Sequence, residues 1–243
     1  MISKLKTQDQ RNSLLKYADD CYLLIPASNI STTAMELAGV EAWALSCNLK
    51  LNTNKSKELI ITLPRSKMSN FPSEYPGIER VHNTLILGVQ ITDKLVFELH
   101  VNHICTRALQ SIYAIRILIA HGLTGQRLHD VVRSTTLARL SYASPAWYGF
   151  TNAEQRGRLK AVIRKLTRLQ YLPVDQPSFD ELVLHIDRNL FMSVLKNEGH
   201  VLHHLLPPVK ITKYALRPQL HNRQLPYADN FNRRGFILRM LYF

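Results

Sequence analysis

Residues 14–25 have the sequence LLKYADDCYLLI, in which two short apolar runs flank the adjacent carboxylates Asp19 and Asp20. Apolar runs of this length around a polar tip are typical of a β-hairpin. Adjacent carboxylates repel one another, and burial at the end of core strands raises that cost unless a cation lies beside them. The pattern therefore indicates a cation site at a hairpin tip. The alternative is that the aspartates serve the turn alone, because Asp side chains support tight turns.

Magnesium is the cation that such a pair is expected to bind, with manganese as a substitute. Mg²⁺ prefers oxygen ligands and is commonly held by one or two carboxylates together with substrate phosphates. Two such ions can stabilise both the attacking and the leaving oxygen of an in-line phosphoryl transfer. An Asp19–Asp20 pair is therefore of a kind that can hold magnesium for phosphoryl transfer.

The hydrophobic pattern changes from strand-like to helix-like near residue 93. In the first part, Thr33 and Glu36 fit a capping box at the start of a helix over 33–47. Short strands are expected at 59–63 and on both sides of Gly88, where a glycine favours a turn. From residue 97 the apolar positions recur at intervals of three and four, which predicts helices over 97–120, 124–142, 153–171, 179–196 and 232–241.

The charge of the chain is concentrated in its second part. The formal net charge is +13 and the sequence pI is about 9.8. Residues 1–100 hold 11 Lys and Arg against 10 Asp and Glu, whereas residues 101–243 hold 20 against 8. Such an excess predicts a polyanionic partner, either nucleic acid or an acidic membrane surface.

Other features of the composition favour a soluble intracellular protein, in the nucleus or the cytoplasm. The three cysteines are widely spaced, which argues against a disulfide framework. The first residues lack the apolar core of a signal peptide, and no apolar run reaches the roughly 20 residues that span a bilayer. We therefore expect no membrane partner.

A basic stripe occupies the helix expected over 153–171. Its cations recur mostly every four residues, opposite an apolar face, and a row of cations along a helix suits a phosphate backbone. A solvated helix face is the alternative, but such faces usually mix signs, and here Glu154 is the only counterweight. The predicted nucleic-acid-binding residues are Arg156, Arg158, Lys160, Arg164, Lys165 and Arg168. Five further arginines would extend the stripe if their helices face the same side: Arg107, Arg116, Arg127, Arg133 and Arg139.

Four segments in order resemble the reverse transcriptases of retrotransposons without long terminal repeats, in particular the jockey-like elements. The hairpin resembles their catalytic motif C. Residues 48–61 (NLKLNTNKSKELII) resemble motif D, residues 85–93 (LILGVQITD) resemble motif E, and residues 139–147 (RLSYASPAW) resemble a stretch of the thumb. The resemblance is strong over 14–150 and weaker over 151–243.

The resemblance implies an α+β fold: a partial right-hand polymerase palm over 1–93, thumb helices over 94–150 and a basic helical extension over 151–243. It implies an RNA-directed DNA polymerase acting on an RNA template, a DNA primer, their RNA–DNA hybrid and deoxynucleoside triphosphates. Asp19 and Asp20 would bind the metal, and Tyr17 would lie beside the primer end. Lys55 would lie near the triphosphate, or would be a turn lysine in water.

The sequence departs from the family pattern before the hairpin. The family requires another palm aspartate, a fingers region and a Gln-Gly segment, and the only carboxylate before residue 14 is Asp9, in a polar segment. We therefore expect a truncated copy that is inactive alone. Two alternatives stay open: a non-catalytic remnant that grips RNA or RNA–DNA hybrid through its basic helices, and an inert fragment.

Overall fold

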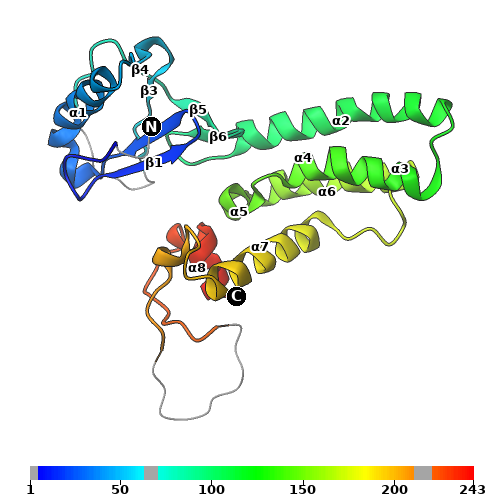
Figure 1. Ribbon diagram of the computed structural model, residues 1–243. Coiled ribbons are helices and arrows are strands. Elements are labelled where there is room, and N and C mark those ends of the chain that lie inside the picture. Colours follow the sequence, from blue (N-terminus) through cyan, green and yellow to red (C-terminus); the bar gives the residue numbers. More distant parts are fainter. Residues whose placement is uncertain (1–4, 63–70, 211–220) are drawn as a thin grey trace. The chain divides into compact units, whose positions relative to one another are not determined.

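The computed structural model describes residues 5–62, 71–210 and 221–243 (Figure 1). Helices and small two-stranded sheets both occur, which confirms the predicted α+β class. The chain divides into two compact units, one ending at Thr84 and the other beginning at Leu85. This division falls within the strand β5 (Asn83–Ile86), earlier than the boundary at residue 93 that the sequence pattern indicated.

The first unit contains the expected hairpin. Strands β1 (Ser13–Tyr17) and β2 (Asp20–Leu24) pair antiparallel, with Tyr17 opposite Asp20. The expectation that these strands are buried is wrong, because every residue in them is exposed or half-buried. The alternate side chains Leu15 and Tyr17 are 55% and 64% exposed, so one face of this sheet lies open to solvent.

Helix α1 (Thr33–Ser46) forms where the sequence predicts it, but its start differs. The expected capping box is wrong: Thr32 is the N-cap and makes no side-chain cap hydrogen bond. The helix follows directly on the 3₁₀ helix η2 (Ala27–Thr32), so the hydroxyl of Thr33 donates back to the carbonyl of Ile30 (2.7 Å).

Glu36 uses its carboxylate to hold the segment before the hairpin. It is buried and accepts hydrogen bonds from the backbone N–H groups of Gln8 (2.9 Å) and Asp9 (2.8 Å) and from the amide of Asn12 (2.8 Å). Burial alone would raise the pKa of Glu36, but these hydrogen bonds outweigh burial and hold the pKa below its ordinary value. Glu36 therefore fixes residues 8–12 against α1.

The expected buried strand over residues 59–63 is wrong for the part that the structure describes. A parallel pair forms earlier, between β3 (Lys57–Glu58) and β4 (Glu79–Arg80), after the 3₁₀ turn η3 (Thr53–Lys55). Within the described residues no strand continues the pairing after β3, because β4 ends at residue 80, and residues 59–62 lack regular structure. Leu63 lies outside the described residues.

The second unit is mostly helical. The end of β5 and its partner β6 (Val89–Thr92) lie at its start, and α2 packs against α4 and α6 while α6 packs against α7. Apart from a short helix over residues 144–147 that was not predicted, the helices agree with the predicted ranges to within a few residues. They are α2 (Glu98–Ala120), α3 (Gly125–Val132), α4 (Ala138–Ser141), α5 (Ser144–Trp147), α6 (Ala153–Arg168), α7 (Phe179–Lys196) and α8 (Phe236–Leu241), with 3₁₀ turns η5 (Tyr148–Phe150), η6 (His203–Leu205) and η7 (Asn232–Arg234).

Between α3 and α4 the chain does not break but passes through a π-helical segment, η4 (Arg133–Leu137). The three pieces form one continuous rod, called the α3–α4 rod below. The buried residues Leu128, Val132, Thr136 and Leu140 recur every four residues along the rod. Four-residue steps drift by about 40° each on a regular α-helix. The π-helical turn takes up the drift and keeps these residues on the core side.

The core of this unit centres on Trp147, which is fully buried. Its ring meets His100 of α2 edge-on (5.0 Å between ring centroids) and stacks near Phe179 of α7 (6.5 Å). Its indole N–H donates to the carbonyl of Tyr142 (2.9 Å). One side chain therefore joins α2, the end of the rod, and α7.

The C-terminal helix α8 is tied to α7 by a partly buried ion pair. Arg239 donates to the carboxylate of Asp187 (2.8 Å) and to the carbonyl of Pro145 (3.3 Å). Phe191, Met240 and Leu241 form a small core cluster beside it. The pair thus fixes α8 against α7. Among the described residues, no helix is both long and apolar enough to cross a membrane.

Replacing Glu36 by Ala should destabilise the first unit by about 2–3 kcal/mol, because the backbone N–H groups of Gln8 and Asp9 and the amide of Asn12 would lose their partly buried acceptor. Hydrogen–deuterium exchange should become faster in α1 and in residues 8–12 and stay unchanged in α6. Glu41→Ala, on the same helix, is the matched control. Equal protection in the two variants would contradict the role given to Glu36.

The helical unit should lose stability in mildly acidic solution. Burial, with the nearby charge of His103, lowers the pKa of His100 to about 4. The unfolded side chain titrates near 6.5, so the unfolded chain binds a proton between these values that the folded chain does not. The contribution is fully present above about pH 6.5 and is lost as the pH falls toward 4, by about 2 kcal/mol between pH 7 and pH 5. Urea unfolding at pH 7 and at pH 5 measures the change in the free energy of unfolding. The His100→Gln variant should lack the part of this change that comes from His100.

Candidate carboxylate pair and nucleic-acid interface

The two carboxylates lie at the tip of the first hairpin. Because Tyr17 pairs with Asp20, only Ala18 and Asp19 form the loop. Ala18 has a φ of 49°, in the left-handed region that an alanine seldom adopts. Asp19 and Asp20 are both exposed, and the hydroxyl of Tyr22 donates to Asp20 (3.2 Å). The turn thus presents two adjacent carboxylates to solvent.

This pair fits part of a magnesium site. Adjacent exposed carboxylates can supply one or two oxygen ligands, and phosphate and water oxygens commonly complete the shell of Mg²⁺. The described residues contain no group of three or more His, Cys, Asp or Glu side chains arranged to hold a metal ion. Asp9 is engaged elsewhere: Arg11 donates to its carboxylate at 2.6 and 3.1 Å and lowers its pKa far below the ordinary value.

The other two residues that the resemblance predicts for an active site, Tyr17 and Lys55, differ in their placement. Tyr17 is directly opposite Asp20 in the hairpin and is 64% exposed. Lys55 ends the 3₁₀ turn η3, where its backbone N–H donates to Asn52 (3.1 Å) and its side chain is exposed. Tyr17 thus lies beside the carboxylates, whereas no described hydrogen bond or ion pair joins Lys55 to the hairpin.

The basic stripe of α6 divides into two groups. Three of its cations are half-buried and held by other parts of the helical unit. Arg156 donates to the hydroxyl of Thr151 (3.1 Å) and lies over the ring of Tyr148 (4.9 Å). Lys160 forms an ion pair with Asp180 of α7 (2.6 Å). The third, Arg158, donates to the side chain of Asn102 on α2.

The remaining three cations, Arg164, Lys165 and Arg168, are exposed. Among the residues that the structure describes, none of them forms an ion pair with a carboxylate. The division follows from helix geometry, because residues four apart are offset by about 40°. The stripe therefore turns by about 120° between Arg156 and Arg168, from the packed side of α6 to its open side.

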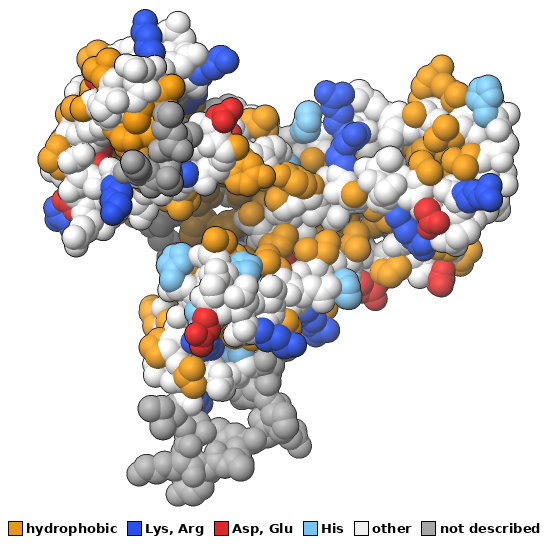
Figure 2. All heavy atoms as spheres, viewed as in Figure 1, with side chains coloured by type: hydrophobic (Ala, Val, Ile, Leu, Met, Phe, Trp, Pro, Cys, Tyr) orange, Lys and Arg blue, Asp and Glu red, His pale blue; other side chains and the backbone are white. Residues whose placement is uncertain are grey.

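Helix α6 is firmly held at its start and along its buried face. Asn152 and Gln155 form a reciprocal capping box at its start, and Leu159, Val162 and Leu166 are buried. The three exposed cations thus stand on a rigid helix, where little conformational entropy is lost when a phosphate binds. Their positions suit sequence-independent contacts to a phosphate backbone. Figure 2 shows further Lys or Arg side chains together with a histidine over α2 of the same unit.

Comparisons with known protein families, with curated proteins and with solved structures found no match. The functional assignment therefore depends on the residues described above.

Replacing Arg164 and Arg168 by Gln should weaken binding to duplex DNA and lower the slope of log K against log salt by about 1.8, since each phosphate contact contributes about 0.9. The charge-matched variant Arg156→Gln with Lys160→Gln should change the slope much less, because those cations are already occupied within the protein. Fluorescence anisotropy over a salt series measures both. Equal slopes for the two variants would contradict the division of the stripe.

Proposed function

We propose that this chain is part of a reverse transcriptase of a retrotransposon without long terminal repeats, an RNA-directed DNA polymerase. The observation that carries the proposal is the exposed Asp19–Asp20 pair at the tip of an antiparallel hairpin, with Tyr17 beside it. A basic helical unit follows it in the chain, as a thumb follows a palm in that family. The substrates would be an RNA template, a DNA primer and deoxynucleoside triphosphates.

A contact between two of the family-like segments supports the proposal. The hydroxyl of Tyr142, in the thumb-like segment, donates to the carbonyl of Leu87 (3.1 Å), in the segment that resembles motif E. The ring of Tyr142 packs so closely on Gly88 that an added Cβ would lie 3.2 Å from it. Gly88 also has a φ of 82°, a conformation that favours glycine over any other residue.

In this proposal Asp19 and Asp20 are ligands on one side of a magnesium site. Bound magnesium, or manganese in its place, would neutralise phosphate charge and activate the primer hydroxyl for attack. The chain itself contributes the rigid turn that holds both carboxylates, and Tyr17 beside them. Since two adjacent carboxylates supply only part of the ligands of a two-ion site, we expect the chain alone not to extend a primer.

A second candidate function is a non-catalytic nucleic-acid-binding protein that holds RNA or RNA–DNA hybrid. The observation that favours it is the group of exposed cations Arg164, Lys165 and Arg168 on α6, which requires no metal site. In either function the protein would bind nucleic acid, in the nucleus or the cytoplasm.

Primer extension on an RNA template, with magnesium or manganese, distinguishes the two. We expect no extension by the purified chain or by Asp19→Ala, together with binding of the RNA–DNA hybrid that weakens steeply with salt. Extension that disappears in Asp19→Ala would overturn the expectation of inactivity, and would mean that another carboxylate or a second copy of the chain completes the metal site. Absence of salt-dependent binding would contradict both functions.

A further inference from the structure

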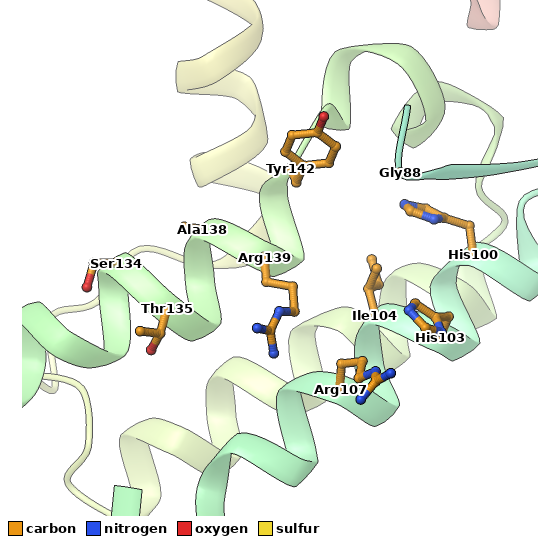
Figure 3. Close-up of a pocket in the computed structure, with 10 residues that line it drawn as sticks. All are labelled: Gly88, His100, His103, Ile104, Arg107, Ser134, Thr135, Ala138, Arg139 and Tyr142. Carbon is orange, nitrogen blue, oxygen red and sulfur yellow. The ribbon is translucent and has the colours of Figure 1, made fainter. Parts of the chain in front are cut away.

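A cavity of about 500 Å³ opens between α2 and the α3–α4 rod of the helical unit. Its α2 wall is formed by residues 100, 103, 104 and 107, which lie on one helix face, and its other wall by residues 134–142 of the rod and the residue that follows it. Figure 3 shows Arg139 extending from α4 toward α2, where His103, Ile104 and Arg107 lie. The cavity lies wholly within one compact unit and apart from the exposed cations of α6.

The polar lining of the cavity is basic. Arg107 and Arg139 both line it, and neither guanidinium has a hydrogen-bond or ion-pair partner among the described residues. His103 adds a third nitrogen group, and no lining residue is Asp or Glu. Unpaired guanidiniums on facing helices, without a carboxylate between them, attract an anion, and their planar forks suit phosphate oxygens.

The π-helical segment η4 contributes hydroxyl groups to the same wall. Ser134 and Thr135 line the cavity, and each hydroxyl donates its hydrogen to the carbonyl of Val131, at 3.2 and 2.6 Å. With their hydrogens used, the oxygens can accept hydrogen bonds from a ligand. Short π-helical stretches within α-helices occur frequently at functional sites. The rod wall therefore offers the hydroxyl oxygens as acceptors beside the Arg139 donors, and the α2 wall offers the donors of Arg107.

His100, at the end of the cavity near Gly88, carries an unpaired buried group. It is 2% exposed, and its Nδ1 accepts from the backbone N–H of Gln90 (3.4 Å). The neutral ring then carries its hydrogen on Nε2, and this atom has no partner among the described residues. A buried donor without an acceptor is costly, so it points to a group that is bound here.

The remaining lining is apolar and suits the sugar or base of a nucleotide. Ile104 and Ala138 face the cavity from the two helices, and the ring of Tyr142, fixed by its hydrogen bond to Leu87, lies at one end (Figure 3). A cavity of this volume is in the range of small-molecule sites. It is larger than a lone phosphate requires, and it combines an apolar surface with a basic one.

We propose that this cavity is a nucleotide-binding site, in which Arg107 and Arg139 hold the phosphate and the surface of Ile104 and Ala138 contacts the sugar or base. The ligand is a nucleoside phosphate, either as a free mononucleotide or as one unit of a single strand; the strand source rests on the proposed nucleic-acid function. The site would bind a single nucleotide, in addition to the contacts that α6 makes with the phosphate backbone of the nucleic acid.

The test is titration of the full chain with a fluorescein-labelled single-stranded RNA and, separately, with adenosine monophosphate. Arg107→Gln with Arg139→Gln should weaken binding by at least about tenfold and lower the salt slope for the RNA by about 0.7, because the two arginines hold one phosphate. Lys94→Gln with Lys196→Gln removes the same charge from exposed positions outside the cavity and should have a much smaller effect. Circular dichroism melting checks that each variant is folded.

A second variant separates the cavity from general electrostatic attraction. Ala138→Phe should fill the space beside Ile104 without changing any charge, and it should weaken binding as much as the double arginine variant does. Loss of RNA binding alone would identify a strand as the ligand, and loss of mononucleotide binding as well would show that free nucleotides enter. Full binding by both cavity variants would overturn the proposal. If Arg164→Gln with Arg168→Gln still weakened RNA binding in that case, the proposed function would stand without this site.

Discussion

The packing of Trp147 is the constraint on which the helical unit depends. Its indole N–H donates to the carbonyl of Tyr142. The chain between these two residues turns at Ala143, which has a φ of 50°. That turn ends the α3–α4 rod and directs the hydroxyl of Tyr142 to the backbone of Leu87. The same ring packs on His100 of α2, so the two walls of the cavity are positioned by one side chain. A buried tryptophan typically contributes about 3–5 kcal/mol to stability, enough to hold the strained alanine in place.

The sequence predicted the elements whose signals are local. The hairpin follows from two apolar runs and a short polar tip, and the long helices follow from apolar positions three and four residues apart. The errors arose where distant residues decide the outcome. Glu36 has the sequence position of a capping residue, but its carboxylate is taken by backbone groups of residues 8 and 9, which no local pattern shows. The apolar run at 59–63 has strand composition without a continuing partner strand in the part that is described.

The candidate sites, too, could be predicted only where their residues are close together in the sequence. The Asp19–Asp20 pair could be found from sequence because both residues lie in one turn. The cavity could not, because it combines residues 100–107 with residues 134–142, and their proximity depends on how α2 packs against the rod. The signal was partly present: Arg107 and Arg139 were among the arginines that could join a basic surface if their helices faced one side. The stripe on α6 was visible too, but which of its cations are free depends on Tyr148 and Asp180, outside the helix.

The π-helical turn in the α3–α4 rod determines where the chain can lose one residue without disturbing the core. The π-helical turn over residues 133–137 contains one residue more than an α-helical turn of the same length would. The insertion of a single codon into a regular helix would have this effect. Loss of one codon there would restore a regular helix, with Leu128 and Leu140 still on the core side. Loss of a codon elsewhere in the rod would rotate all the residues after it by about 100° and bring polar groups into the core. The extra residue is therefore dispensable for folding, and what it changes is the surface that Ser134 and Thr135 present to the cavity.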